Sequence, residues 1–396
     1  MQVRRSSDRL GRRLRWRLHP DAKWAAAAWT TIAIALTLVQ FFAHRWGGRE
    51  AHPRVSVVDL EWLFDGWVGR DSSDYLMIAE HGYVVERLLV VFPGFSLVLK
   101  GIAILGEPRA WGVVAAAGLG LLSVLGVQSW CTNAGLDHRE QRAAVAAYLL
   151  FPYAWYLYGP LYGDSLYVAA SVWAFVAVQH RRWTTAGLLG AIASATRPTG
   201  FAVAIGLCIA TLEASGFHVG FESQATGRRR TLDLRAVLSV NLAWAGLAAY
   251  MGWLWVARGS PFAWLTAQRH FHSTGPATLL KEQFVAAFWS GAKTSYLTST
   301  TLSAAILASS FVLVPVVRRH FGGGPAALVF FSSLMPAISV ATFMGVGRYQ
   351  LVLFPAFAVV GRSLAHKPAL GRLVAAASFT TLVYFTVGFA RGAYLA

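Results

Sequence analysis

The sequence predicts an all-α, polytopic membrane protein with about eleven transmembrane helices. The chain of 396 residues is 56% hydrophobic and only 13% charged, and its mean hydropathy is +0.49. Soluble domains usually carry about a quarter charged residues, so this composition excludes an ordinary soluble enzyme. Apolar runs of roughly 15 to 22 residues recur along the chain, which is the length needed to cross ~30 Å of hydrocarbon.

Basic residues separate these apolar runs and predict their orientation. An Arg-rich segment at 1–23 precedes the first run, so we expect a basic cytoplasmic tail, an anchor rather than a cleaved signal peptide, and one membrane-embedded domain at 24–396. The formal charge of +17 is then explained by cytoplasmic loops, not by nucleic-acid binding. The expected spans are 24–42, 108–130, 143–159, 164–179, 184–196, 199–213, 236–256, 301–317, 325–345, 350–361 and 373–390.

The apolar run 88–105 poses the main topological choice. If it crossed the membrane, the basic loops that follow would all lie outside, against the usual charge rule. Pro93 and Lys100 within this run also suit a helix that lies along the outer face of the membrane. We therefore expect residues 43–107 to form a partly helical extracytoplasmic loop.

This loop contains the most informative motif of the chain, Gly69 to Tyr83, which gathers carboxylates, a histidine and aromatic residues. Charged groups kept near a bilayer are costly and commonly functional. Asp71 or Asp74 could act as a general base toward a hydroxyl group, because burial raises the basicity of a carboxylate. The alternative is that both aspartates only solvate the loop or cap a helix that begins near Ser72.

The end of the same motif offers a second acid and an imidazole. Glu80 and His81 could face the cavity that contains Asp71. The alternative is a helix C-terminus with Gly82 in the left-handed conformation. Both descriptions can hold for the backbone, so the open question concerns the two side chains.

Three further charged residues are expected on the outer side. Asp164 lies where two spans meet, and a charged turn is common at such a place. Arg197 lies in the segment 196–200, which interrupts two short spans, and broken helices at membrane depth line polar cavities. Arg197 and Arg348 could clamp a lipid phosphate through their planar guanidinium groups, whereas the alternative is interfacial snorkelling.

Metal, disulfide and nucleotide chemistry have little support in the sequence. His270 and His272 lack a third ligand at helical spacing, so we expect no metal and no cofactor, and His270 is a candidate for substrate binding instead. Cys131 and Cys208 are the only cysteines, and no spacing pairs them. A Gly-rich phosphate loop and a nucleophilic Ser elbow are both missing from the sequence.

Taken together, these motifs resemble the PIG-V-like membrane mannosyltransferases, the GPI mannosyltransferase 2 family. The similarity covers about residues 24–365, and it rests on several short motifs in the same order. The matching segments are Asp71-Ser72-x-x-Tyr75-Leu76-x-Ile78-Ala79-Glu80-His81-Gly82-Tyr83, Phe92-Pro93, Phe151-Pro152, Tyr162-Gly163-Asp164-Ser165-Leu166, Thr196-Arg197-Pro198-Thr199-Gly200, Arg348-Tyr349 and Phe354-Pro355.

The resemblance implies a GT-C-type glycosyltransferase architecture with an extracytoplasmic active site and a polyprenyl-phosphate-mannose donor. It also implies that Asp71 is the catalytic base. The chain departs from the family pattern at Gly69-Arg70, where the family has Arg-Trp, and at Asp74, where the family has Trp. Asp164 replaces a Glu of the family, which keeps the charge on a shorter side chain.

We therefore hypothesise an inverting glycosyltransferase in the plasma membrane, with its active site on the extracytoplasmic side. It would transfer mannose from polyprenyl-phosphate-mannose to a glycolipid, glycan or protein acceptor, with Asp71 as the base. The expected substrate-binding residues are Tyr75, Glu80, His81, Asp164, Arg197, His270, Arg348 and Tyr349.

Two rival hypotheses remain open. The first is a transporter or flippase of lipid-linked sugars, which inverted sequence repeats would favour, although the sequence shows none. The second is an inactive relative that binds a lipid-linked sugar within an envelope assembly complex. The altered residues 69, 70 and 74 are consistent with this second alternative.

Overall fold

The computed structural model describes residues 20–46, 61–217, 233–268, 281–290, 294–340 and 342–393. All regular elements within these residues are helices, which confirms the predicted all-α class. The helices are α1 (Pro20–Trp46), α2 (Glu61–Phe64), α3 (Ser72–His81), α4 (Pro93–Ile102), α5 (Pro108–Asn133), α6 (His138–Leu149), α7 (Asp164–Gln179), α8 (Trp183–Thr196), α9 (Gly200–Ala214), α10 (Leu234–Asn241), α11 (Ala245–Arg258), α12 (Ala263–Ala267), α13 (Glu282–Trp289), α14 (Thr294–Phe321), α15 (Gly323–Ser339), α16 (Val346–Tyr349), α17 (Phe354–Ala365) and α18 (Pro368–Ala390).

Five of the helical stretches in the described residues are long and apolar enough to cross a membrane. They are Pro20–Trp46, Pro108–Asn133, Leu234–Arg258, Tyr296–Phe321 and Pro368–Ala390. Most of the other expected spans correspond to shorter apolar helices, namely α7, α9, α15 and α17. Large side chains such as Leu38, Leu122, Leu188, Val312 and Phe379 are exposed on the helices, as a lipid-facing surface requires. The count of eleven spans remains a prediction.

One expected span is interrupted, and the apolar run 88–105 forms a short helix as expected. The expected span 143–159 is not one helix, because α6 ends at Leu149 and a short 3-10 helix follows at Ala154–Leu157. Pro152 explains the interruption, since proline disfavours a helical conformation at the residue before it and lacks an N–H donor. The run 88–105 forms α4 with Pro93 at its first position, and its ten residues span about 15 Å, which is too short for a crossing.

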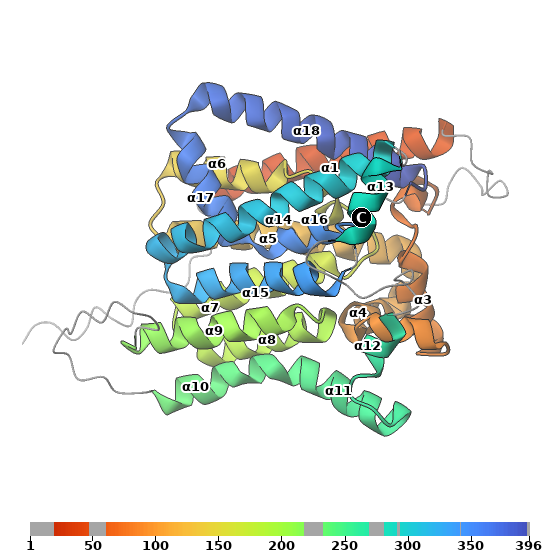
Figure 1. Ribbon diagram of the computed structural model, residues 1–396, viewed down its shortest axis with the longest axis horizontal. Coiled ribbons are helices and arrows are strands. Elements are labelled where there is room, and N and C mark those ends of the chain that lie inside the picture. The colour runs from red at the N-terminus through yellow and green to blue at the C-terminus, as the bar shows by residue number, and fades with distance from the viewer. Residues whose placement is uncertain are drawn as a thin grey trace, which may run out of the picture.

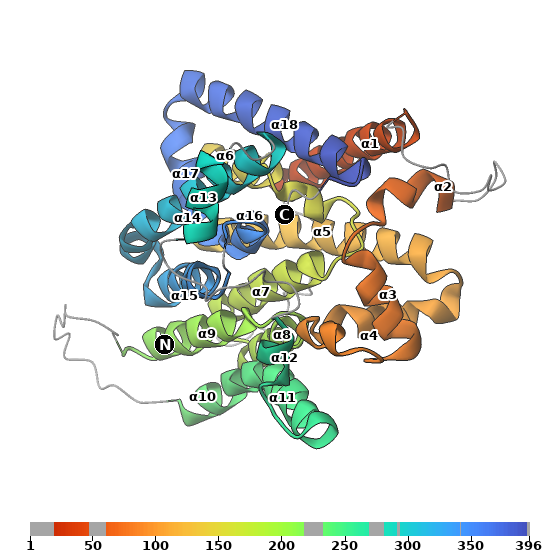
Figure 2. The ribbon, with the colours of Figure 1, turned by 45° about the vertical axis from the view of Figure 1, so that its right-hand side comes forward.

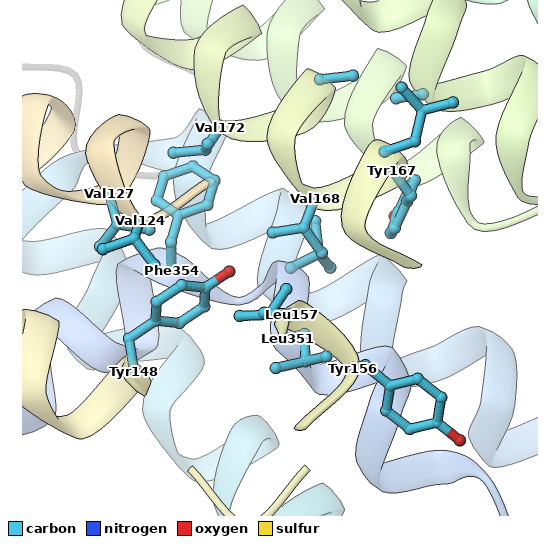
Figure 3. Close-up of a cluster of buried hydrophobic side chains, with 14 of the residues drawn as sticks. Val124, Val127, Tyr148, Tyr156, Leu157, Tyr167, Val168, Val172, Leu351 and Phe354 are labelled. Atoms are coloured by element: carbon cyan, nitrogen blue, oxygen red, sulfur yellow. The ribbon is translucent and has the colours of Figure 1, made fainter. Parts of the chain in front are cut away.

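Helix α7 forms the centre of the bundle. Its sequence is apolar on nearly all sides, which is typical of a helix that is buried all round, and almost every one of its residues is buried. It packs against α5, α8 and α9 (Figure 2). Figure 3 shows Val168 and Val172 of this helix within a cluster that includes Tyr148 and Phe354. Tyr156 lies at the edge of this cluster, and its hydroxyl group points away from Phe354 (Figure 3).

The bundle has two distinct ends. The long helices lie side by side, and the short helices α3, α4, α12 and α13 gather at one end, on the right of Figure 1, which we call the site end. The opposite end contains the starts of α6, α8 and α18 and the ends of α7 and α14, and we call it the basic end. Its Arg and Lys residues include Arg139, Arg142, Arg181, Arg182, Arg318, Arg319, Lys367 and Arg372. Basic residues also lie at the site end, among them Arg45, Arg87, Arg109 and Arg258, so this distribution does not assign either end to the cytoplasm. Residues 1–19 of the predicted tail lie outside the described residues.

Candidate active site

The carboxylate of Asp71 is available for chemistry rather than used as a helix cap. Asp71 immediately precedes α3, yet its side chain accepts no capping hydrogen bond within the described chain. Its backbone N–H donates to the hydroxyl group of Tyr162 at 3.2 Å, which fixes the position of the residue. Its Oδ2 atom accepts a hydrogen bond from Nη1 of Arg348 at 3.3 Å, and 30% of the side chain is exposed. A partly exposed carboxylate held by one guanidinium group can still accept a proton from a substrate.

Asp74, one turn further along α3, has a different environment. Its Oδ1 atom accepts a hydrogen bond from Arg87 at 2.7 Å, and the side chain is only 7% exposed. Burial raises the pKa of Asp74 above its ordinary value, although the charge of Arg87 acts in the opposite direction. Asp74 therefore ties α3 to the segment around Arg87, and of the two aspartates only Asp71 faces Arg348.

Arg348 lies in a group of tyrosine rings that we call the tyrosine cage, formed by Tyr156, Tyr162 and Tyr349. Its guanidinium carbon is 5.7, 5.6 and 5.7 Å from the centres of these three rings, respectively. Such aromatic faces stabilise a cation that has lost part of its hydration. The Nε–H of Arg348 has no hydrogen-bond partner among the described residues. This nitrogen is buried, and only 15% of the Arg348 side chain is exposed, so an anion from outside the chain would contact the exposed part of the guanidinium group.

A buried ion pair between Asp164 and Arg197 contacts the tyrosine cage through Tyr349. Helices α7 and α8 form an antiparallel hairpin, which brings Asp164 at the start of α7 next to Arg197 after the end of α8. Nη1 of Arg197 donates to Oδ1 of Asp164, and the two residues are only 6% and 1% exposed. The Arg197 guanidinium lies over the ring of Tyr349, 4.4 Å from its centre. Tyr349 is thus in contact with both Arg197 and Arg348.

Gly347 allows the backbone of α16 to approach Tyr153. A Cβ atom at position 347 would overlap the Tyr153 ring. This ring cannot move aside easily, because its hydroxyl group is hydrogen-bonded to the backbone of Ser299 at 2.9 Å and to the hydroxyl group of Ser303 at 2.7 Å. The position of Arg348, the next residue, therefore depends on a glycine at 347.

We expect Gly347→Ala to lower the free energy of unfolding by about 1–3 kcal/mol, the usual cost of an extra methyl group in a packed core. The shift of α16 should also weaken any activity that needs Arg348. Thermal unfolding in detergent measures the stability. The control is Gly252→Ala, since a Cβ atom at that helical position meets nothing within 4 Å. Equal stability of the two variants would contradict the proposed crowding.

The structure brings together five of the nine expected site residues. Asp71, Asp164, Arg197, Arg348 and Tyr349 form one connected group.

Tyr75 lies beside this group, and Glu80 and His81 do not join it. The centre of the Tyr75 ring is 6.0 Å from that of Tyr162, and burial raises the pKa of Tyr75 to about 12. Glu80 and His81 lie at the far end of α3, 3.7 Å from each other, with 52% and 65% of their side chains exposed. Gly82 follows with a φ of 75°, so the expected helix end is present. His270 lies outside the described residues.

Tyr156 and Tyr162 are the functional candidates that sequence reasoning did not select. Their signal is the aromatic density of the segment 153–162, which contains four tyrosines and a tryptophan. Within the described ranges, no three His, Cys, Asp or Glu side chains are grouped as metal ligands.

Comparisons with known proteins give a coarse structural similarity. No protein-family model matches the chain, and no curated protein sequence is significantly similar to it. The crystal structure of an oligosaccharyltransferase from Archaeoglobus fulgidus, in complex with zinc and sulfate, superposes with a TM-score of 0.42 and 13% sequence identity. This alignment covers 92% of the present chain and 53% of the archaeal chain. The present chain thus spans about half the length of that protein.

Proposed function

We propose that this protein is an inverting glycosyltransferase that uses a polyprenyl-phosphate sugar as its donor. The observation that carries this proposal is the contact of Asp71 with Arg348, two residues 277 positions apart in the chain. It places a carboxylate that can accept a proton beside a guanidinium group that can bind a phosphate. The choice of mannose, and of an extracytoplasmic acceptor, rests on the resemblance to the PIG-V-like family.

In the proposed reaction Asp71 acts on the acceptor. Its free carboxylate oxygen accepts the proton of an acceptor hydroxyl group while that oxygen attacks the anomeric carbon of the sugar. The bond between this carbon and the phosphate oxygen breaks, and the configuration inverts in a single displacement. One carboxylate is sufficient for this scheme, in contrast to hydrolysis by paired carboxylates. Asp74 is not needed, because it is already bound to Arg87.

Arg348 would act on the leaving group. Negative charge grows on the phosphate as the glycosidic bond breaks, and a preorganised guanidinium group stabilises that charge most strongly in the transition state. The tyrosine cage holds the guanidinium in place before the substrate arrives. Arg197 has a different proposed role, since its ion pair with Asp164 makes it a positioning residue for Tyr349 and the cage.

The proposed function is tested with purified protein in proteoliposomes. The donor is polyprenyl-phosphate carrying radiolabelled mannose, with glucose and arabinose donors in parallel, and envelope glycolipids serve as acceptors. We expect label to pass from the mannose donor to the acceptor. Binding of the donor without transfer would support the inactive sugar-binding alternative, and absence of both binding and transfer would reject the proposal.

The role of Arg348 predicts a strong effect of a mild substitution. Arg348→Lys keeps the positive charge but removes the planar fork of donors, so we expect kcat to fall by about 10²–10³-fold. The matched control is Arg87→Lys, which alters an arginine outside the cage and should retain transfer. A kcat for Arg348→Lys within two-fold of the unmodified protein would contradict the assignment of Arg348 to the leaving group.

A further inference from the structure

A second site lies on the side of the bundle, in a groove between α6, α14, α17 and α18. Its volume is about 700 Å³, which is within the range of ordinary ligand sites. Apolar side chains form most of its walls, among them Ala146, Leu302, Ile306, Phe357 and Ala375. The twelve residues of α6 span about 18 Å, similar to the ~15 Å depth of the hydrocarbon in one leaflet.

The groove is charged at one end only. Arg139, Arg142 and Arg372 line it where α6 and α18 begin, which is the basic end of the bundle. The positive charge of Arg142 is paired with the carboxylate of Asp21, to which its Nε atom donates a hydrogen bond at 3.0 Å. Arg139 and Arg372 are exposed, and neither forms an ion pair with a carboxylate of the described residues.

The acidic groups nearby are already engaged. Asp137 accepts hydrogen bonds from the backbone N–H groups of Arg139 and Glu140, so its carboxylate caps α6. Glu140 pairs with Arg362 at 3.1 Å and with His366 at 3.6 Å. The guanidinium groups of Arg139 and Arg372 are therefore accessible to an anion from outside the chain, and the nearest carboxylate to Arg139, that of Asp137, is used as the helix cap.

The opposite end of the groove does not open onto the candidate active site. It ends near Phe151, Pro152 and Gln350, and neither Asp71 nor Arg348 lines it. The fully buried ring of Tyr153 packs against Gly347 and separates this end from the tyrosine cage. The arginines that could bind a phosphate within the groove, Arg139 and Arg372, therefore lie at the end away from Arg348.

We propose that the groove binds one anionic phospholipid of the leaflet at the basic end. The phosphate lies between Arg139 and Arg372, and an acyl chain lies along the apolar walls toward Gln350. Basic pockets between transmembrane helices bind anionic headgroups in this way, because the guanidinium groups gain a partner while the chain covers apolar surface. This site is distinct from the proposed sugar-donor site and does not depend on it.

Native mass spectrometry of the full chain, released from nanodiscs, tests the proposal. The nanodiscs contain equal amounts of phosphatidylglycerol and phosphatidylcholine with matched acyl chains, and undecaprenyl phosphate is added in a second series. We expect one retained phosphatidylglycerol, preferred about ten-fold or more over phosphatidylcholine, since each arginine near the membrane surface attracts an anionic lipid.

Two pairs of variants locate the site. Arg139→Gln combined with Arg372→Gln should abolish the preference for phosphatidylglycerol, whereas Arg319→Gln, at an exposed arginine that does not line the groove, should keep it. Ala375→Trp should fill the groove and release both lipids, whereas Ala376→Trp, at the exposed neighbouring residue, should not.

Either of two results would overturn the proposal. One is an unchanged preference for phosphatidylglycerol in the double arginine variant, which alters only exposed residues and so tests the site even if Ala375→Trp fails to fold. The other is displacement of phosphatidylglycerol from the wild-type protein by undecaprenyl phosphate, which would assign the groove to an isoprenoid chain.

Discussion

Asp71→Asn is expected to lower the rate of sugar transfer by about 10²–10⁴-fold, the usual contribution of a general base. The amide keeps the size of the carboxylate and one oxygen that can accept the hydrogen bond from Arg348. It cannot take a proton from the acceptor hydroxyl group at neutral pH. Donor binding should therefore persist while kcat falls. Single-turnover transfer from a labelled donor in proteoliposomes separates these two quantities.

The matched control for this experiment is Asp74→Asn. Asp74 lies on α3, three residues after Asp71, and its partner is Arg87 rather than Arg348. Its substitution should leave kcat within a few-fold of the unmodified protein. Equal losses in the two variants would show that the charge of α3 matters in general and that Asp71 has no special role. An unchanged kcat in Asp71→Asn would remove the base assignment.

Much of the helical framework was predictable because its signals are local. The apolar runs predicted α7, α8 and α9 to within one residue, since helix ends coincide with turn residues such as those between Thr196 and Gly200. The expected span 143–159 was interrupted because a single Pro152 outweighed the apolar content around it. The number of membrane crossings depends on tilt and on lipid contact, which neither hydropathy nor helix length determines.

Five members of the candidate site could be predicted from the sequence, but the contacts that give each of them its role could not. The resemblance to the PIG-V-like family selected Asp71 over Asp74, but only packing shows that Asp71 faces Arg348 while Asp74 pairs with Arg87. Likewise, nothing local shows that Arg197 is neutralised by Asp164, because this ion pair depends on how the hairpin of α7 and α8 closes. The cage tyrosines were missed because aromatic residues in an apolar chain usually belong to the core.

The ion pair between Asp164 and Arg197 leads to the largest expected effect on stability. Arg197→Met leaves the Asp164 carboxylate buried without its partner, and such a change usually costs about 3–5 kcal/mol. Asp164→Leu leaves an unpaired guanidinium and should cost a similar amount. The double variant removes both charges, so it should be considerably more stable than either single variant. Unfolding in mixed micelles measures the four free energies of a double-mutant cycle.

The same double variant also separates the contribution of the ion pair to stability from the role of Arg197 in positioning Tyr349. The double variant should fold yet transfer sugar poorly, because Tyr349 loses the guanidinium that lies 4.4 Å from its ring centre and the cage around Arg348 loosens. Glu80→Gln, at an exposed pair with His81, is the control and should change stability by less than about 0.5 kcal/mol. Full activity in a stable double variant would show that the pair only holds α7 against α8, and that Arg348 is placed without it.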